Sequence, residues 1–313
     1  MSVKVFIDGS SGTTGLRIAD RLAQRPEIEL LSISAEGRKD VNERAKVINS
    51  ADLAFLCLPD AASKEVMPLL RPDVKVLDTS TAFRTDAAWD YGFPELRGQK
   101  AKIQNSYRVA VPGCYASGFI SIARPLVELG LAPADYPFSC TGISGYSGGG
   151  KKMIAEYESV DRPVHSKLDA PKSYGLGLAH KHLPEMQKIS GLAHTPMFVP
   201  VVCDYYCGMQ VLVPLDLTLA GSTAEQVAEG IAAYYKDAAT VKVHALNEAL
   251  PENGLYSNAM AGTDRMELYM TVNAAGDQMM LVSLFDNLGK GSSGAAVQCM
   301  NLMLGLEETE GLE

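Results

Sequence analysis

The chain has 313 residues, 47% of them hydrophobic, and a formal net charge of −9 at pH 7. It is long enough for two domains with sizeable cores. Its isoelectric point near 5.2 argues against nucleic acid as a partner, since phosphate neutralisation needs a basic face. It contains no apolar run long enough to cross a membrane and does not start like a signal peptide, so we expect a cytoplasmic protein without membrane contact.

The first residues predict a nucleotide-binding unit. Residues 3–8 are typical of a short buried strand, and residues 16–22 have the apolar spacing of a helix. The glycine turn between them lets backbone N–H groups approach a pyrophosphate at the start of the helix. Its GxxGxxG spacing differs from the GxGxxG fingerprint, so an ordinary glycine-rich turn is the alternative. The residues expected to contact the dinucleotide are Gly9, Ser10, Ser11, Gly12, Thr13, Thr14 and Gly15.

The second expected strand spans residues 29–34, and the charged residues that follow it indicate which dinucleotide the protein binds. At this position an acidic residue binds the ribose of NAD, and a basic residue binds the extra phosphate of NADP. Arg38 and Lys39 favour NADP, whereas Glu36 favours NAD. A solvated charge cluster is the third interpretation.

Two apolar runs, residues 51–59 and 74–78, predict further strands covered on both faces, with a short helix over residues 63–70 between them. Pro68 must then lie near the end of that helix. This alternation of strand and helix predicts a Rossmann-like α/β domain.

Cys114 lies in the segment VPGCYASG, on a Pro-Gly turn directly before residues with helical apolar spacing. The N-terminus of a helix stabilises a thiolate, which is the nucleophilic form of cysteine. Cys114 is therefore a candidate catalytic nucleophile. The alternative is a small buried core cysteine.

The segment of residues 142–152, GISGYSGGGKK, is too rich in glycine for us to expect a strand or a helix. It is interpreted as a mobile anion-binding loop, with a flexible surface linker as the alternative.

The segment HKHLPE supplies a candidate base. Pro184 suits the first turn of a helix, which places His182 at the start of that helix, where the positive dipole end favours a neutral imidazole. Glu185 can reach back to orient it. If this backbone is extended, only one of His180 and His182 faces the thiol. His180 and His182 could also be zinc ligands, but no third ligand is adjacent to them. The remaining alternative is that both are ordinary surface histidines.

The second half of the chain predicts an α+β domain with an open, largely antiparallel sheet. Four long strands are expected without a helix between each pair, at residues 197–203, 209–216, 266–272 and 278–285. A helix with a capping box is expected over residues 223–235. Six scattered cysteines indicate free thiols, and Cys203 and Cys207 alone are weak metal ligands, so no metal is expected.

A second glycine-rich turn precedes the last helical pattern, at residues 286–295. We expect the chain to return there to the first domain and add backbone donors to the cofactor site, from Asn287, Lys290 and Gly291. A simple C-terminal docking helix is the alternative. The expected domains are residues 1–113 with 287–313 for NADP binding, and residues 114–286 for catalysis and oligomerisation.

Taken together, seven segments resemble the N-acetyl-gamma-glutamyl-phosphate reductases of the arginine pathway, in their shorter, type 2 form. The resemblance runs from the glycine turn to the last helix. The matching segments are GSSGTTG at 9–15, DTSTAFR at 78–84, YGFPEL at 91–96, VPGCYASG at 111–118, GISGYSGGGK at 142–151, HKHLPE at 180–185 and NLGKGSSGAA at 287–296. Two positions depart from the family: Val111 stands where it usually has Asn, and Ser117 where it usually has Thr.

The resemblance implies reduction of an acyl phosphate by NADPH through a cysteine thioester. Cys114 would attack N-acetyl-L-glutamyl 5-phosphate, phosphate would leave, and hydride would give N-acetyl-L-glutamate 5-semialdehyde. His182 would be the acid/base, held by Glu185. The residues we expect at the substrate are Arg84, Arg108, Ser144, Gly145 and Lys151, with a structural ion pair as the alternative for Arg108. The open sheet edge favours a homo-oligomer, a dimer or a tetramer.

Two other functions remain open at this point. One is a related acyl-phosphate reductase, which would resemble aspartate-semialdehyde dehydrogenase or act on a carrier-linked aminoadipyl phosphate. The other is a redox sensor that binds NADP without turnover. The presence of Cys114, His182 and Glu185 argues against the sensor.

Overall fold

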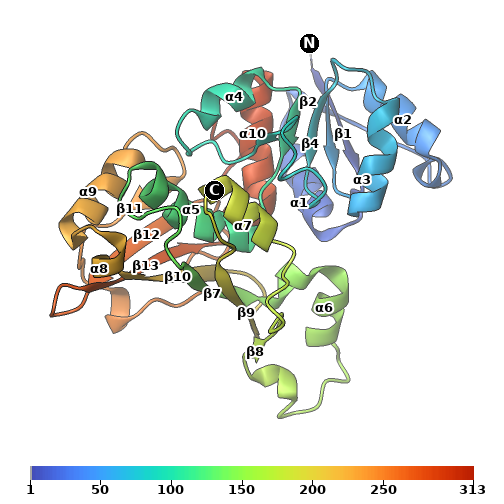
Figure 1. Cartoon of the computed structure of the whole chain (residues 1–313). Helices are drawn as coiled ribbons and strands as arrows, with labels where there is room; N and C mark the ends of the chain where they lie inside the picture. The colour runs from blue at the N-terminus through green and yellow to red at the C-terminus, as the bar shows by residue number, and fades with distance from the viewer. Residues whose placement is uncertain (1) are drawn as a thin grey trace. The chain divides into compact units, whose positions relative to one another are not determined.

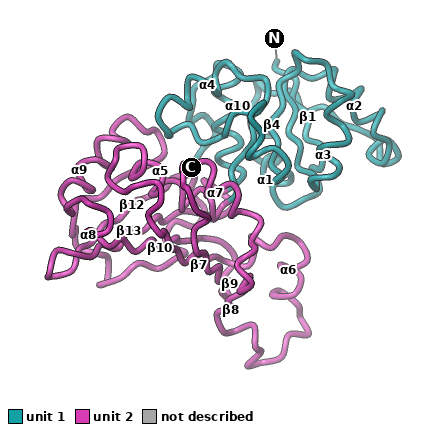
Figure 2. Tube along the Cα trace, in the orientation of Figure 1, with its two compact units in different colours: residues 1–113, 292–312 teal, residues 114–291, 313 magenta. Residues whose placement is uncertain are grey.

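The structure, a computed structural model, describes residues 2–313 and divides into two compact units (Figure 2). Unit 1 contains the chain up to Gly113 and again Ser292–Leu312, and unit 2 contains Cys114–Gly291 and Glu313. The chain thus returns to unit 1 at Ser292, and not at Asn287 as we expected, because residues 287–291 cluster with unit 2.

Unit 1 is built on a six-stranded sheet whose strands all run parallel, in the order β2-β1-β3-β4-β6-β5 (Figure 1). The strands are β1 (Val3–Asp8), β2 (Ile28–Leu31), β3 (Leu53–Leu56), β4 (Lys75–Asp78), β5 (Asp90–Tyr91) and β6 (Arg108–Ala110). The helices are α1 (Thr13–Leu22), α2 (Val41–Ser50), α3 (Asp60–Val66), α4 (Gln99–Asn105) and α10 (Gly294–Leu304). The predicted Rossmann-like α/β fold is confirmed. The expected helix over residues 63–70 ends at Val66, and Pro68 lies in a separate 3-10 turn.

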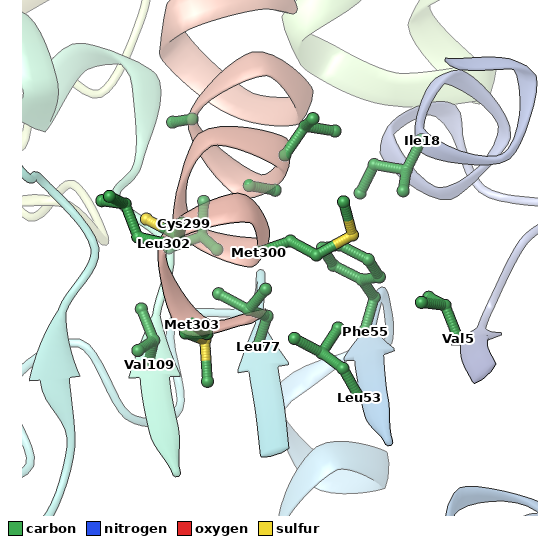
Figure 3. Packing of buried hydrophobic residues seen from close by; sticks show 14 of the residues in the cluster. Val5, Ile18, Leu53, Phe55, Leu77, Val109, Cys299, Met300, Leu302 and Met303 are labelled. Carbon is green, nitrogen blue, oxygen red and sulfur yellow. The ribbon is translucent and has the colours of Figure 1, made fainter. Parts of the chain in front are cut away.

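Both faces of this sheet are covered by helices. Buried side chains of α1, α4 and α10 pack on one face, and those of α2 and α3 pack on the other. Figure 3 shows the first face, where Met300 and Met303 of α10 lie over Phe55 and Leu77 of the central strands. Each such side chain contributes about 1.5–3 kcal/mol when fully buried. This packing holds the returning C-terminal helix within unit 1.

Unit 2 is built on a seven-stranded mixed sheet in the order β11-β12-β13-β10-β7-β9-β8. Four of its six strand pairings are antiparallel, and the pairings of β11 with β12 and of β7 with β9 are parallel. The four long strands predicted from the sequence are confirmed. The strands are β7 (Ser139–Gly145), β8 (Lys172–Ser173), β9 (Met197–Cys203), β10 (Met209–Asp216), β11 (Val241–Val243), β12 (Met266–Val272) and β13 (Gln278–Phe285).

The helices of unit 2 include the predicted capping box, formed by Thr223 and Gln226 at the start of α9. The helices are α5 (Cys114–Glu128), α6 (Gly150–Tyr157), α7 (Leu183–Ser190), α8 (Leu217–Ala220) and α9 (Ala224–Tyr234). The apolar side of α5 packs on the sheet against β10 and β13, and α7 packs against α5.

The interpretation of residues 142–152 as a mobile loop is wrong. These residues form the end of β7, a 3-10 turn at Tyr146–Gly149 and the start of α6. A side chain on Gly142 would lie 2.4 Å from the Tyr115 ring, and one on Gly145 would lie 2.6 Å from the carbonyl oxygen of Tyr205. Glycine therefore serves close packing here, and the ladder bonds to β9 and β10 outweigh its low strand propensity.

Candidate active site

Cys114 is the first residue of α5 and is partly exposed. The helix is fixed to the sheet one turn later, where a side chain on Gly118 would lie 2.5 Å from Val211. The Ser283 hydroxyl of β13 also donates to the carbonyl oxygen of Gly118 over 3.1 Å. Because the helix lies this close to the sheet, the position of Cys114 is set by the packing of unit 2.

Gly291 lies directly against the candidate nucleophile. A Cβ atom at this position would be 3.0 Å from the Cβ of Cys114 and 3.1 Å from the carbonyl oxygen of Asp286. The backbone N–H of Gly291 donates to that same carbonyl oxygen over 2.9 Å. Gly291 thus forms part of the packing around Cys114, and its amide is engaged within its own turn.

Asn287 also has a role inside unit 2. Its side chain is 2% exposed, its Oδ1 accepts from the Gly208 N–H over 2.8 Å, and its Nδ2 donates to the Ser147 hydroxyl over 3.0 Å. Asn287 therefore joins the β9–β10 turn to the 3-10 turn that follows β7. Its neighbour Lys290 is equally buried. We therefore do not propose Asn287 as a cofactor-binding residue.

Tyr115 packs against both candidate imidazoles, and the sequence did not identify it as a site residue. Its ring centroid lies 5.8 Å from that of His180 and 6.1 Å from that of His182, and the two imidazoles are 4.8 Å apart. Its hydroxyl donates to the carbonyl oxygen of Val201 in β9. Burial raises the pKa of the Tyr115 phenol well above its ordinary value, so the ring stays neutral. The adjacency of Tyr115 to Cys114 was the only signal for it in the sequence.

The backbone of His180 and His182 is not extended, so the condition under which only one imidazole would face the thiol does not hold. The Leu183 N–H donates to the carbonyl oxygen of His180 over 3.0 Å, which closes a turn and brings both rings to the same side. The Nδ1 of His180 accepts the backbone N–H of His182 over 3.2 Å. Burial, and then the nearby charge of Lys181, lower the pKa of His180 to about 4. His180 is thus neutral at pH 7.

His182 stands at the start of α7 with Pro184 in its first turn, as the sequence predicted. Its side chain is 5% exposed, and that of Glu185 in the same turn is 2% exposed. The packing of α7 on α5 brings this helix start to the helix that carries Cys114.

Two of the expected substrate cations bind backbone carbonyl groups. Arg84 is buried and donates to the carbonyl oxygens of Val111 and Thr79, each over 2.9 Å. Arg108 donates to the carbonyl oxygens of Val74, Tyr107 and Arg71. Burial lowers the pKa of Arg108. These bonds hold loops of unit 1. Because Arg108 is engaged in this way, we do not propose it as a substrate-binding residue.

The other three expected substrate residues lie near the end of β7. Ser144 is buried and donates to the carbonyl oxygen of Gly145 over 3.1 Å. Lys151 is exposed in the first turn of α6. It is the cation of the expected set that remains at the surface of unit 2.

The glycine turn of unit 1 is tight and leads directly into a helix. Gly9 has φ of +88°, and a side chain there would lie 2.3 Å from the carbonyl oxygen of Cys57. The Gly12 N–H donates to the Gly9 carbonyl oxygen over 2.9 Å, and α1 starts at the next residue. The hydroxyls of Thr14 and Ser292 are 3.1 Å apart. The returning segment therefore does meet the glycine turn, at Ser292.

Beside this turn lies a cavity of about 370 Å³ between the ends of β1 and β2. Its lining includes Asp8, Gly9, Ser10, Ser11, Leu31, Ser32, Arg38 and Arg44. Lys39 is exposed and does not line it. Arg44, in the second turn of α2, was missed, because nothing in the local sequence separates it from a solvated helix arginine.

Over residues 2–313, no cluster of three or more His, Cys, Asp and Glu side chains could hold a metal ion. Cys203 is the last residue of β9 and Cys207 lies between β9 and β10, two strands on opposite sides of β7. Among the helices that the structure describes, none has the length and apolar character to span a membrane.

Two family models match the chain. Residues 4–104 match the NAD-binding domain of semialdehyde dehydrogenase, and residues 114–287 match the semialdehyde dehydrogenase dimerisation domain. The second match begins at Cys114, where unit 2 begins. Unit 1 is therefore related to nicotinamide dinucleotide-binding domains.

Relatives of known name cover nearly the whole chain. The N-acetyl-gamma-glutamyl-phosphate reductase of Trichormus variabilis is 46% identical over 99% of this chain and 99% of its own length. That of Burkholderia cenocepacia is 46% identical over 96% of this chain and 97% of its own length.

Solved structures share the fold at low identity. Aspartate semialdehyde dehydrogenase II from Vibrio cholerae has a TM-score of 0.72 at 18% identity, over 97% of this chain and 99% of the other. The Candida albicans enzyme, solved with NADP, has a TM-score of 0.65 at 15% identity, with the same coverage of both chains. The α/β fold of unit 1 and the mixed sheet of unit 2 are thus those of the semialdehyde dehydrogenases, and the chain belongs to this family, among the N-acetyl-gamma-glutamyl-phosphate reductases.

Proposed function

We propose that this protein reduces N-acetyl-L-glutamyl 5-phosphate to N-acetyl-L-glutamate 5-semialdehyde and phosphate, with NADPH as the reductant. The observation that carries the chemistry is the cluster in unit 2, where a partly exposed cysteine starts α5 and its neighbour Tyr115 packs against two imidazoles. The substrate follows from relatives 46% identical to the chain, which carry the name of this reductase.

In the first step, the thiolate of Cys114 forms a bond to the acyl carbon, and the bond from that carbon to the phosphate oxygen breaks. Phosphate leaves with the electron pair of that bond, and an acyl thioester remains on Cys114. A thioester accepts hydride far more readily than a free carboxylate does. NADPH, when bound, would supply that hydride. The electron pair of the carbon–sulfur bond then returns to Cys114 as its thiolate, and the aldehyde leaves.

In this proposal His182 moves the proton. Its place at the start of α7 favours the neutral ring, which can take the proton of the Cys114 thiol. Glu185, in the same turn, supports the charged ring that forms. His180 is a positioning residue, because its neutral Nδ1 accepts the backbone N–H of His182.

The residues of unit 1 fit a nicotinamide dinucleotide. The turn from Gly9 to Gly15 approaches neighbouring backbone more closely than any side chain permits, and the start of α1 attracts a pyrophosphate. The adjacent cavity is lined by Arg38. We propose NADP over NAD because a guanidinium at the end of the second strand binds the 2′-phosphate that NAD lacks.

We also propose a homo-oligomer, a dimer or a tetramer. The support is the match of unit 2 to a dimerisation domain. In addition, Met280 and Leu212 lie partly exposed on one face of its sheet, with Tyr269 and Val282 buried beside them. A second sheet of the same kind would cover such a face.

The reverse reaction tests the proposed function. The enzyme with NADP⁺ and phosphate should form NADPH with N-acetyl-L-glutamate 5-semialdehyde at least about 100-fold more efficiently than with L-aspartate semialdehyde, because discrimination follows from contacts made in the transition state. Greater efficiency with the aspartate compound would make the protein a related acyl-phosphate reductase. Absence of turnover with both aldehydes, with NADP still bound, would make it a sensor.

A further inference from the structure

Arg44 is a buried arginine that lines the cofactor cavity. The residue is 7% exposed, it lines the 370 Å³ cavity, and neither its Nε nor its Nη2 has a hydrogen-bond partner among the described residues. Buried donors in native proteins are almost always bonded. A guanidinium that adjoins a cavity and has two such nitrogen atoms therefore favours an acceptor from outside the described residues.

The carboxylates near Arg44 do not satisfy these donors. Its Nε lies 3.6 Å from Oδ2 of Asp8, and its Nη2 lies 3.7 Å from Oε2 of Glu65. These are ion-pair distances, and both are too long for a hydrogen bond. Oδ2 of Asp8 is also without a hydrogen-bond partner in the described chain. The Arg44–Asp8 pair thus leaves both of its partners able to bond to a third group.

The position of the cavity indicates which acceptor is bound. Ser32, which follows β2, and Arg38 line the same cavity as Arg44. In dinucleotide-binding domains the end of the second strand faces the adenosine ribose, where a 2′-phosphate is bound if there is one. A dianionic phosphate offers several acceptor oxygens to the planar guanidinium fork.

We propose that Arg44 is a second guanidinium for the 2′-phosphate of NADP, acting with Arg38 in the same cavity as a specificity-determining residue. This inference rests on the proposed function, because it assumes that NADP binds in unit 1. It makes a buried arginine of α2, and not Lys39, the partner of Arg38.

Titration with cofactor fragments tests this assignment without turnover. Isothermal calorimetry of the full-length protein compares 2′,5′-ADP with 5′-AMP, which differ only in the 2′-phosphate. The wild type should bind 2′,5′-ADP at least about tenfold more tightly, and Arg44→Gln should remove most of this ratio while its affinity for 5′-AMP stays the same. Arg71→Gln is the matched control, since Arg71 belongs to the same unit, pairs with Asp73 and does not line the cavity.

The outcomes separate this inference from the proposed function. Equal affinities of the wild type for both fragments would overturn the NADP preference itself and the role of Arg44 with it. A wild-type ratio retained in Arg44→Gln would overturn the role of Arg44 alone and leave it a structural partner of Asp8. If Arg44→Gln does not fold, Asp8→Asn decides: it removes the competing carboxylate, so the ratio should rise severalfold, and an unchanged or smaller ratio overturns the inference.

Discussion

Burial separates the cysteines of this chain chemically. It raises the pKa of Cys57 to about 12, and it raises the pKa of Cys140 and of Cys203 as well. Those thiols are therefore protonated at neutral pH. Cys57, Cys203 and Cys207 are also partly exposed residues, but Cys114 is the cysteine at the start of a helix, where a thiolate is favoured.

Replacement of this sulfur tests the nucleophile. Cys114→Ser should bind 2′,5′-ADP as the wild type does but should lose at least about 10³-fold in the maximal rate, because an alcohol is a poor nucleophile. Steady-state kinetics together with calorimetry provide the measurement. Cys203→Ser, the control, should keep normal activity. A Cys114→Ser variant that retains activity contradicts the thioester.

The two imidazoles have different roles in the proposed mechanism. His182→Asn should lower the maximal rate by about 10² to 10⁴-fold, which is the usual contribution of a positioned acid/base. Glu185→Gln should show a smaller loss in the same parameter. His180→Asn should act mainly on binding or stability. If His180→Asn lowers the maximal rate more than His182→Asn does, the two roles must be exchanged.

The low pKa of His180 also predicts a pH dependence of stability. Its pKa of about 4 in the fold lies below the ordinary value of 6.5, so the unfolded chain takes up this proton first as the pH falls. The stability from neutral His180 is fully present above pH 6.5 and is lost as the pH falls to about 4. In urea denaturation, His180→Asn should therefore lose less stability than the wild type over this window. The exposed His194→Asn should behave as the wild type does, and equal slopes for all three proteins would refute the prediction.

At the scale of elements, apolar strands could be predicted from the sequence and glycine-rich ones could not. The alternation of Met209–Asp216 and the apolar run of Gln278–Phe285 carry their own signal, and both strands form within those bounds. The strand Ser139–Gly145 carries none, because its glycines serve Tyr115 and the β9–β10 turn. Such contacts come from residues distant in the sequence, which local propensity does not contain.

The turn that carries Gly291 gives a prediction at this scale. Gly291→Ala should displace Cys114, because its new Cβ would lie 3.0 Å from that of Cys114. The rate of Cys114 alkylation by iodoacetamide, followed by peptide mass spectrometry across pH, should change by at least about tenfold or shift its midpoint, since it depends on the thiolate and its access. Gly230→Ala in α9 is the control, because its new Cβ would lie 2.7 Å from Leu131. It should lower stability without changing this profile, and identical profiles for both variants would contradict the positioning of Cys114.

For the whole molecule, sequence reasoning recovered the two units and the family, but not all side-chain roles. The glycine turn, Cys114 and the start of α7 were predicted because each sits at a recognisable junction of elements. The carbonyl partners of Arg84 and Arg108 were not, since they lie on other segments of unit 1. Arg44 was missed for the same reason, as its surroundings come from β1 and α3.

The central claim is that the acyl group passes through a thioester on Cys114. The most direct measurement mixes the enzyme with NADP⁺ and N-acetyl-L-glutamate 5-semialdehyde in the absence of phosphate. Without phosphate to accept the acyl group, the account predicts a burst of NADPH equal to the enzyme concentration and an N-acetylglutamyl adduct on the Cys114 peptide. Phosphate-dependent turnover without a burst, or with the adduct on a residue other than Cys114, would contradict it.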